Sequence, residues 1–304
     1  MVNVKSIFTK KISILSAIFL PLIFLVQPLN ASKHDYFKIK VIDEETGRGI
    51  PLVELRTQSW IRYYTDSNGI VAFYEPSLMN QDSYLFIESE GYEYPKDLLG
   101  FSGFVINPSK EDSVIIKMQR INIAERLYRI TGPGIYRDSF LLGVPTPLKH
   151  PLLNGKVLGQ DSNLSLKYKG EIFWVWGDTF KPAYPWGNFS VSAATSKFPE
   201  NGGLPAETGV DLNYFVDSTG FSKSMIVLEG KGYVWFDWLM TIPDETGYEK
   251  LVAKYARVKM DFTNYNSFNS FYFYNILYLQ SQITPNNSSY YYISCNSGDF
   301  IFYL

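Results

Sequence analysis

Two acidic motifs beside aromatic residues are the part of this sequence best suited to chemistry. Gly159–Ser162 (GQDS) precedes a predicted strand–turn–strand segment, and Trp174–Thr179 (WVWGDT) ends it. A carboxylate can exchange protons with sugar hydroxyls or accept their hydrogen bonds, and an indole face covers the apolar C–H face of a pyranose. Glycoside hydrolysis needs two carboxyl groups in one pocket. Asp161 and Asp178 are therefore candidate site residues, with the open alternative that both only shape turns.

The first 31 residues have the pattern of an export signal. A basic segment with three lysines comes first: Lys5, Lys10 and Lys11. Residues 12–26 are apolar apart from two serines, and Leu29-Asn30-Ala31 offers a cleavage site. The apolar stretch is shorter than the roughly 20 residues that a membrane helix needs. We expect a secreted or periplasmic protein with no stable membrane span after cleavage, and an uncleaved anchor is the alternative.

The composition narrows the class of protein. The chain has 304 residues, 17% of them aromatic, and a formal net charge of -2, which is typical of neither a nucleic-acid-binding protein nor a helical one. Cys295 is the single cysteine, so no intramolecular disulfide and no cysteine-based metal site can form. The two histidines, His34 and His150, are far apart in the sequence. We expect no cofactor, no metal ion and no nucleic-acid partner.

Residues 36–118 show the alternation of a small β-domain. Apolar and polar residues alternate between Gly-containing turns, which predicts six strands at 37–42, 51–57, 61–65, 70–74, 84–89 and 113–118. Asp66 and Asn68 are expected to form a turn rather than to bind a ligand. Gly91-Tyr92-Glu93 is expected to be a turn after a strand.

Short motifs in this segment resemble the carboxypeptidase-regulatory or transthyretin-like sandwich family. They are Val41-Ile42-Asp43, Thr46-Gly47, Ile50–Val53, Thr65-Asp66, Asn68-Gly69 and Glu90-Gly91-Tyr92. The resemblance implies a structural or carbohydrate-proximal module rather than a catalyst. No convergent acid, base and nucleophile is evident in this segment.

From residue 119 onward a second β-rich domain is predicted. A short helical turn is expected at 124–128, and residues 137–139 are expected to be a loop. Strands are predicted at 164–168, 172–176, 190–195, 212–216, 225–228, 233–242 and 250–258. Short strands at this spacing are typical of the four-stranded meanders that form propeller blades.

The motifs Gly159–Ser162, Trp176–Thr179 and Trp235–Asp237 resemble the five-bladed propellers of arabinanase- and levansucrase-like glycoside hydrolases. The resemblance implies that Asp161 is the catalytic base or nucleophile. It also implies that Asp237 is the second catalytic carboxylate, which orients substrate and tunes the acid. The substrate-binding candidates are Asp178, Trp176 and Gln160, and blade packing is the alternative role for Trp176 and for Trp235. In that family the acid is a Glu of a later blade, and Glu207, in the Gly/Pro-rich loop 199–209, is the spare candidate.

After residue 260 the sequence changes character. Asn, Ser, Tyr and Phe dominate residues 261–304, and Asp299 is the one charged residue after Asp261. The segment is either an aberrant tail from a decayed gene end or a genuine strand-rich ending. Residues 119–260 would then hold about two to three blades. The predicted fold is all-β, with a small transthyretin-like β-sandwich followed by an incomplete β-propeller.

These observations predict a secreted, carbohydrate-active protein of the glycoside-hydrolase-like propeller class. With a truncated propeller it is expected to be weakly active or inactive toward its polysaccharide or glycan partner. The alternatives are a non-catalytic carbohydrate- or surface-binding protein, and a gene product without function.

The export signal gives a first prediction. Residues 1–31 are removed during export, because the basic, apolar and small-residue segments follow one another in the order that signal peptidase requires. N-terminal sequencing of the exported protein should begin near Ser32 or Lys33. Exported material that begins at Met1 would contradict the prediction.

Overall fold

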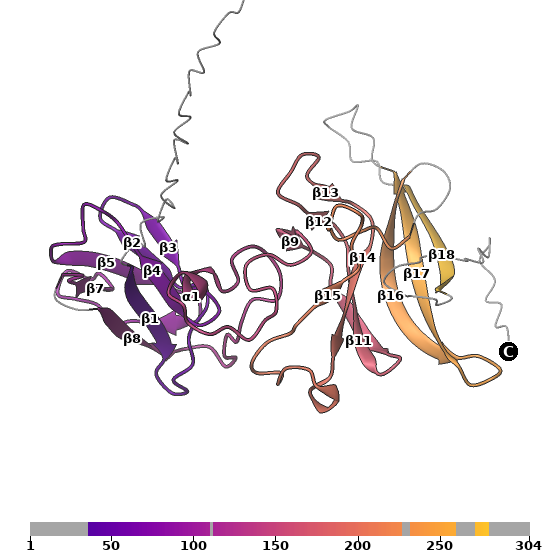
Figure 1. Ribbon diagram of the computed structural model, residues 1–304, viewed down its shortest axis with the longest axis horizontal. Helices are drawn as coiled ribbons and strands as arrows, with labels where there is room; N and C mark the ends of the chain where they lie inside the picture. The colour runs from indigo at the N-terminus through magenta and orange to yellow at the C-terminus, as the bar shows by residue number, and fades with distance from the viewer. Residues whose placement is uncertain (1–35, 110–111, 227–231, 260–270, 280–304) are drawn as a thin grey trace, which may run out of the picture. The chain divides into compact units, whose positions relative to one another are not determined.

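A computed structural model describes residues 36–109, 112–226, 232–259 and 271–279. The fold is all-β, as predicted (Figure 1). Within the residues described there are eighteen strands, one short α-helix and one 3-10 helix. The strands of these residues form five small sheets, and none of the five closes on itself. Within the described ranges, no helix is long and apolar enough to cross a lipid bilayer.

Two four-stranded sheets account for the first eight strands. One sheet has the order β4-β1-β8-β6, with β1 Phe37–Asp43, β4 Ile70–Phe73, β6 Tyr92–Glu93 and β8 Ser113–Arg120. The other has the order β3-β2-β5-β7, with β2 Glu54–Thr57, β3 Arg62–Tyr64, β5 Ser83–Glu88 and β7 Gly103–Ile106. In the first sheet β1 is parallel to β8 and antiparallel to β4.

One hydrophobic core joins these two sheets. Ile39 and Phe73 come from the first sheet, Leu55 and Leu85 from the second, and all four are fully buried in one cluster. The alternation of buried and half-buried residues along β1 follows the two-residue period of a strand. All six strands predicted from that period are present. β6 and β7 are additional, and the turn expected at Tyr92-Glu93 is in fact strand β6, paired with β8.

The segment that follows β8 docks on the turn between β3 and β4. The helical turn expected at 124–128 is absent, and the expected loop at 137–139 is the start of helix α1 (Arg137–Leu141). The carboxylate of Asp66 accepts the N–H of Ser139 at 2.6 Å, and that of Asp138 accepts the N–H of Ala72 at 2.9 Å. These reciprocal bonds explain why a helix forms at 137 rather than at 124, where local propensity alone favours one.

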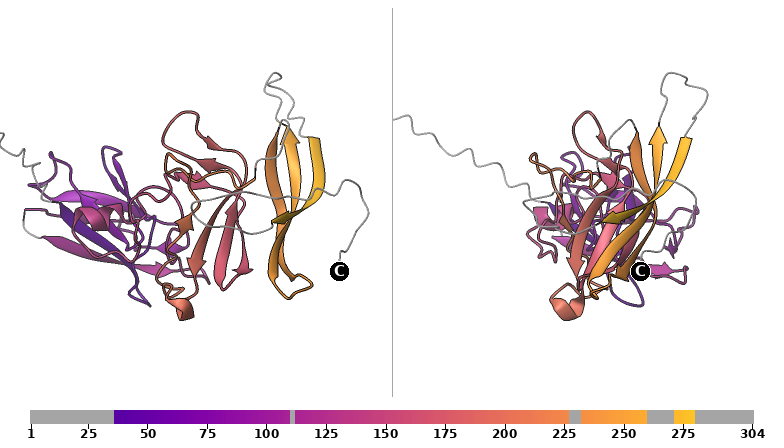
Figure 2. Two further views of the ribbon diagram at one scale, coloured as in Figure 1. Left: turned by 45° about the vertical axis from the view of Figure 1, so that its right-hand side comes forward. Right: turned by 90° about the vertical axis from the view of Figure 1, so that its right-hand side faces the viewer.

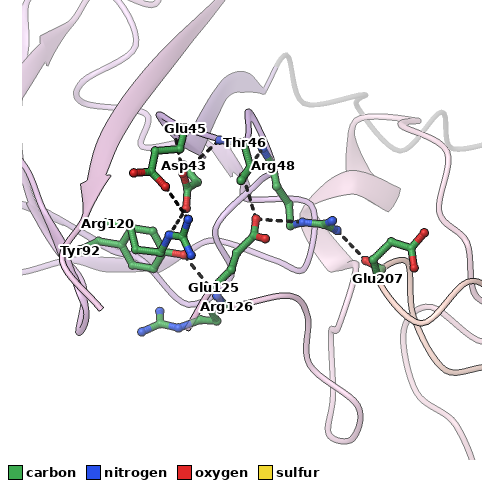
Figure 3. Close-up of polar contacts among 9 residues, drawn as sticks. All are labelled: Asp43, Glu45, Thr46, Arg48, Tyr92, Arg120, Glu125, Arg126 and Glu207. Atoms are coloured by element: carbon green, nitrogen blue, oxygen red, sulfur yellow. Dashed lines mark hydrogen bonds and ion pairs between the residues drawn. The ribbon is translucent and has the colours of Figure 1, made fainter. Parts of the chain in front are cut away.

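Arginine side chains hold the preceding stretch of this segment. The Arg126 guanidinium donates to the carbonyl oxygens of Pro51 and Glu90. Arg48 pairs with Glu125 at 3.0 Å and also donates to the carbonyl oxygen of Glu207, as Figure 3 shows. Charged donors that meet carbonyl and carboxylate oxygens make strong hydrogen bonds, so residues without regular structure are nevertheless fixed here.

A repeated turn with the pattern D-x-x-G, followed by an apolar or aromatic residue, occurs at four places in the described chain. In each, the Asp Oδ1 atom accepts the N–H groups two and four residues later, and the glycine has a positive φ. The turns are Asp66–Ile70, Asp97–Phe101, Asp217–Phe221 and Asp244–Tyr248. The predicted turn at Asp66 and Asn68 is therefore confirmed. Glycine recurs in these turns because a Cβ atom disfavours this backbone conformation.

Three further sheets follow in the chain. One has the order β10-β11-β14-β15, with β10 Leu164–Tyr168, β11 Glu171–Trp176, β14 Ser192–Lys197 and β15 Asn213–Tyr214. The 3-10 helix η1 (Pro199–Asn201) follows β14. A second sheet consists of β16 Tyr233–Pro243, β17 Glu249–Lys259 and β18 Phe271–Leu279, which lie side by side in Figure 2. The third is small, with the order β13-β12-β9 (β9 Gly159–Gln160, β12 Thr179–Phe180, β13 Gly187–Asn188).

A second hydrophobic core joins the β10-β11-β14-β15 sheet to the β16–β18 sheet. Phe173, Val175 and Ala193 of the first meet Val234 and Leu251 of the second, and all five are buried. Strand β18, inside the segment expected to be aberrant, pairs with β17 over its whole length. The rest of that segment, residues 227–228 of the strand expected at 225–228, and the export segment 1–31 lie outside the described residues.

The buried Asp66 carboxylate gives a prediction for stability. Asp66→Ala should lower the free energy of unfolding by about 3 kcal/mol, because each buried N–H left without an acceptor costs about 1–3 kcal/mol. Asp97→Ala is the matched control, since Asp97 makes the same turn on the surface, where water replaces the lost oxygen. Its effect should stay below about 1 kcal/mol. Urea unfolding followed by circular dichroism measures both, and equal losses would contradict the special role of Asp66.

Candidate functional site

The small β13-β12-β9 sheet brings the two acidic motifs together. Gln160 of β9 lies opposite Thr179 of β12, and Thr179 lies opposite Asn188 of β13. The three residues therefore form a row across a sheet whose strands β12 and β13 are close in the sequence, whereas β9 comes from an earlier part of the chain (strands in Figure 1). Asp161 follows β9 and Asp178 precedes β12, so the same pairing places these two residues side by side.

Backbone hydrogen bonds lock Asp161 against the chain at Asp178. The Asp178 N–H donates to Oδ1 of Asp161 at 2.9 Å, and the Asp161 N–H donates to the carbonyl oxygen of Asp178 at 3.2 Å. Gly177 makes the approach possible, because a Cβ atom there would lie 2.6 Å from Oδ1 of Asp161. The close position of the Asp161 carboxylate thus favours glycine at residue 177, directly before Asp178.

The Asp178 carboxyl has the environment of a proton donor. Burial, and then the neighbouring charge of Asp161, raise the pKa of Asp178 above its ordinary value. Its Oδ1 atom is buried and accepts no hydrogen bond from any described residue, so no donor stabilises the ionised form at that oxygen. Asp161 itself is exposed. A carboxyl with a raised pKa beside an exposed carboxylate is an arrangement that general acid–base chemistry uses.

Gln160 has a supporting position in this site. Its Nε2 atom donates to Thr179 Oγ1 at 3.1 Å and to Ser192 Oγ at 2.9 Å, while its Oε1 atom accepts the Tyr214 hydroxyl at 2.7 Å. Burial raises the pKa of Tyr214, so this hydroxyl stays protonated and donates. Because both N–H donors of the amide are used inside the protein, Gln160 fixes strand β9 and keeps only acceptor capacity at Oε1.

Trp176 lies inside the protein. Its side chain is 3% exposed and packs between Trp174, stacked at a centroid distance of 6.2 Å, and Tyr214 at 5.5 Å. Both neighbours occupy ring surface that a sugar would need. These surroundings favour a packing role for Trp176 over the sugar-binding role. Trp235 is half-buried, and its Nε1 atom donates to the carbonyl oxygen of Phe189 at 3.0 Å.

Asp237 and Glu207 lie outside the Asp161–Asp178 pair. Asp237 sits at the bulge of β16 and pairs with Lys254 at 2.9 Å. No hydrogen bond or ion pair among the described residues joins it to Asp161 or Asp178. Glu207 is exposed, and its carbonyl oxygen accepts a hydrogen bond from Arg48 (Figure 3). The pKa of Tyr128 is raised mainly by burial and secondly by the charge of Glu207.

Two exposed aromatic residues in the β12–β13 hairpin were missed by the sequence analysis. Tyr184 is 82% exposed and Trp186 is 63% exposed, and their rings make an edge-to-face contact at 5.7 Å. They lie in the loop that leads from β12, directly after Asp178, to β13. The sequence Tyr-Pro-Trp-Gly at residues 184–187 indicates their exposure, because Pro and Gly favour a turn, and aromatic residues in a turn have no strand in which to be buried.

The same hairpin carries a second unsatisfied polar group. Asn188 accepts the N–H of Ser190 at 2.9 Å through Oδ1, whereas its buried Nδ2 atom has no partner among the described residues. Buried polar groups without partners are rare in stable proteins and are frequent at functional sites. In the described part of the chain, no three His, Cys, Asp or Glu side chains are grouped to hold a metal ion.

Comparisons of the chain with protein-family models, with curated proteins and with solved structures find no match. The site geometry and the residue chemistry therefore carry the functional conclusion.

The pairing of the two aspartates predicts a coupled titration. Asp161→Asn should lower the pKa of Asp178, because it removes a like charge while keeping an oxygen that can accept the Asp178 N–H. Asp237→Asn is the control and should leave that pKa unchanged. Carboxyl ¹³C chemical shifts recorded against pH measure both, and a shift caused by the control alone would contradict the pairing.

The raised pKa also sets the sign of a stability change. Because the pKa of Asp178 is raised in the folded protein, ionisation of this carboxyl opposes folding. The contribution of Asp178 to the free energy of unfolding is therefore fully present below the ordinary aspartate pKa, and it is lost as the pH rises through the raised pKa. Asp178→Asn should remove this loss, which denaturant unfolding at acid and neutral pH can measure.

Proposed function

We propose that this protein binds polysaccharide through the Asp161–Asp178 pair and the exposed aromatic residues of the β12–β13 hairpin. The observation that carries the proposal is the combination in one hairpin of a carboxyl with a raised pKa and two exposed aromatic rings. Carboxylates hydrogen-bond sugar hydroxyls, and aromatic faces cover the apolar face of a pyranose. Trp186 and Tyr184 would serve as this platform, which Trp176 is too buried to provide.

The proposal includes the two family resemblances. Residues 36–118 would be a transthyretin-like sandwich, and two four-stranded sheets around one core support this. Residues 119–260 would be part of a propeller related to arabinanase- and levansucrase-like glycoside hydrolases. The antiparallel β10-β11-β14-β15 sheet and its shared core with β16 and β17 support that assignment. The export signal expected in residues 1–31 supports a proposed activity outside the cytoplasm.

We further propose that hydrolysis is weak or absent. In this site Asp178 would be the acid and Asp161 the base. Oδ1 of Asp161 already accepts a backbone N–H, so one oxygen of this carboxylate is committed to holding the chain and only the other is left for substrate or water. The third candidate, Asp237, is neutralised by Lys254. Poor proton transfer removes about 10²–10⁴-fold of the rate.

Polysaccharide binding by the purified chain tests the function. Affinity electrophoresis against arabinan, xylan, mannan and β-glucans should show retardation. Trp186→Ala and Asp178→Ala should each weaken binding at least about tenfold, or about 1.4 kcal/mol. Tyr248→Ala is the matched control, because Tyr248 is 72% exposed and lies in a different hairpin turn.

Two results would count against the proposal. Unchanged affinity in both site variants would remove the Asp161–Asp178 hairpin from binding. Robust release of sugars by the wild-type chain that Asp161→Asn abolishes would show an efficient hydrolase instead.

A further inference from the structure

A tryptophan occupies a backbone position that this chain elsewhere gives to glycine. The β2–β3 turn, Thr57–Ile61, repeats the D-x-x-G turn: the Thr57 N–H donates to Ile61 and the Trp60 N–H donates to Thr57, both at 3.0 Å. Thr57 Oγ1 replaces the Asp oxygen and accepts the Ile61 N–H at 3.1 Å. Trp60 has a φ of 66°, where the four related turns have glycine at 72° to 84°.

Burial does not explain this tryptophan. A bulky side chain with a left-handed backbone costs free energy, and such strain persists where another requirement maintains it. Trp60 is 66% exposed, so most of its indole faces solvent rather than a hydrophobic core. The turn would form at lower cost with glycine, which points to a function for the ring itself.

The surroundings of Trp60 form a platform of alternating rings and charges. The Arg56 guanidinium lies 4.1 Å from the Trp60 ring and 4.4 Å from the Phe86 ring. Glu54 pairs with Arg56 at 3.6 Å and with Arg62 at 3.3 Å. Glu54, Arg56 and Phe86 alternate with the buried Leu55 and Leu85, so they lie on the outer face of the β3-β2-β5-β7 sheet.

A pocket of about 220 Å³ lies on this face. Its lining includes Glu54, Arg56, Phe86, Glu88, Phe101 and Ser102. Phe101 closes the neighbouring D-x-x-G turn, is 51% exposed, and contacts Phe86 edge to face at 5.7 Å. Trp60 borders the pocket through the Arg56 side chain that it stacks upon.

We propose that this outer face is a second glycan-binding site, for an uncharged pyranose ring of a polysaccharide. In the lining Arg56 pairs with Glu54, and Glu88 adds a further negative charge, so the pocket disfavours an acidic sugar. Glutamate accepts hydrogen bonds from hydroxyls, arginine donates to them, and the rings of Phe101 and Trp60 meet apolar C–H faces. The volume is below the roughly 300–1,000 Å³ of pockets for drug-sized ligands and suits one small polar ring.

This site is separate from the Asp161–Asp178 hairpin and does not depend on it. The β3-β2-β5-β7 sheet contributes no residue to the other site. The aspartate pair can therefore fail as a binding site while the Trp60 site stands, and the reverse is equally possible.

Trp60→Gly tests the proposal, because it separates binding from folding. The full chain carrying this change should melt at the same temperature as the wild type or higher, since glycine relieves the strained turn. Its affinity for the neutral polysaccharide that retards the wild type most, among arabinan, xylan, mannan and β-glucans, should fall at least about tenfold. Phe101→Ala should give a similar loss, and Tyr248→Ala should give none.

The pattern across variants distinguishes the two sites. Loss of binding in Trp60→Gly with binding retained in Trp186→Ala supports the second site alone, and the opposite pattern overturns it. A lower melting temperature with unchanged affinity in Trp60→Gly would also overturn it, because the ring would then be structural. Dependence on Trp60 for polygalacturonate only, or for a protein ligand only, would overturn the assignment to a neutral sugar.

Discussion

The hydrogen bond from a backbone N–H to a carboxylate inside a tight turn is the interaction on which this structure depends most. Small open sheets need sharp, well-fixed turns, and the D-x-x-G turn supplies them at Asp66, Asp97, Asp217 and Asp244. At Asp66 the second oxygen also accepts the N–H of Ser139. One buried side chain therefore joins the first pair of sheets to the helix that leads toward the second region.

The same chemistry positions the candidate site and limits what it can do. Asp161 uses a carboxylate oxygen to accept the N–H of Asp178, as the turn aspartates do locally, but from a distant part of the chain. This bond fixes the pair and commits half of one carboxylate to structure. Burial raises the pKa of Asp178, so the protonated form, which could donate to a sugar oxygen, is more accessible than in an ordinary aspartate. A fixed pair of this kind is suited to binding and poorly suited to rapid proton transfer.

Exposed aromatic residues cluster on hairpins whose backbones are already fixed. Tyr184 and Trp186 extend from the β12–β13 loop, and Trp60 extends from the β2–β3 turn. Solvent-exposed rings on rigid turns lose little side-chain entropy on binding, which favours weak but specific contact with flat sugar surfaces. If one polysaccharide reaches both places, two weak contacts on one chain can bind more tightly than either alone.

Most of the local structure follows from the sequence alone. Alternating apolar residues located six of the eight strands in the first two sheets, because a strand buries every second side chain whatever its partner, while the short strands β6 and β7 were missed. The long strands β16 and β17 were also predicted, although their buried residues do not alternate. Gly and Asp located the turns, since their backbone preferences act within a few residues. The proximity of Asp161 and Asp178 could also be predicted, because these residues flank the two strands of one predicted hairpin.

Only the tertiary structure decided the remaining features, because they depend on partners that are distant in the chain. Helix α1 forms at Arg137–Leu141 since Asp66 and Ala72 bond to it there. Trp176 is buried because Trp174 and Tyr214 close around it. The pocket near Trp60 arises where residues of β2 and β5 meet Phe101 of the Asp97–Phe101 turn, an arrangement that strand pairing sets and local periodicity does not encode.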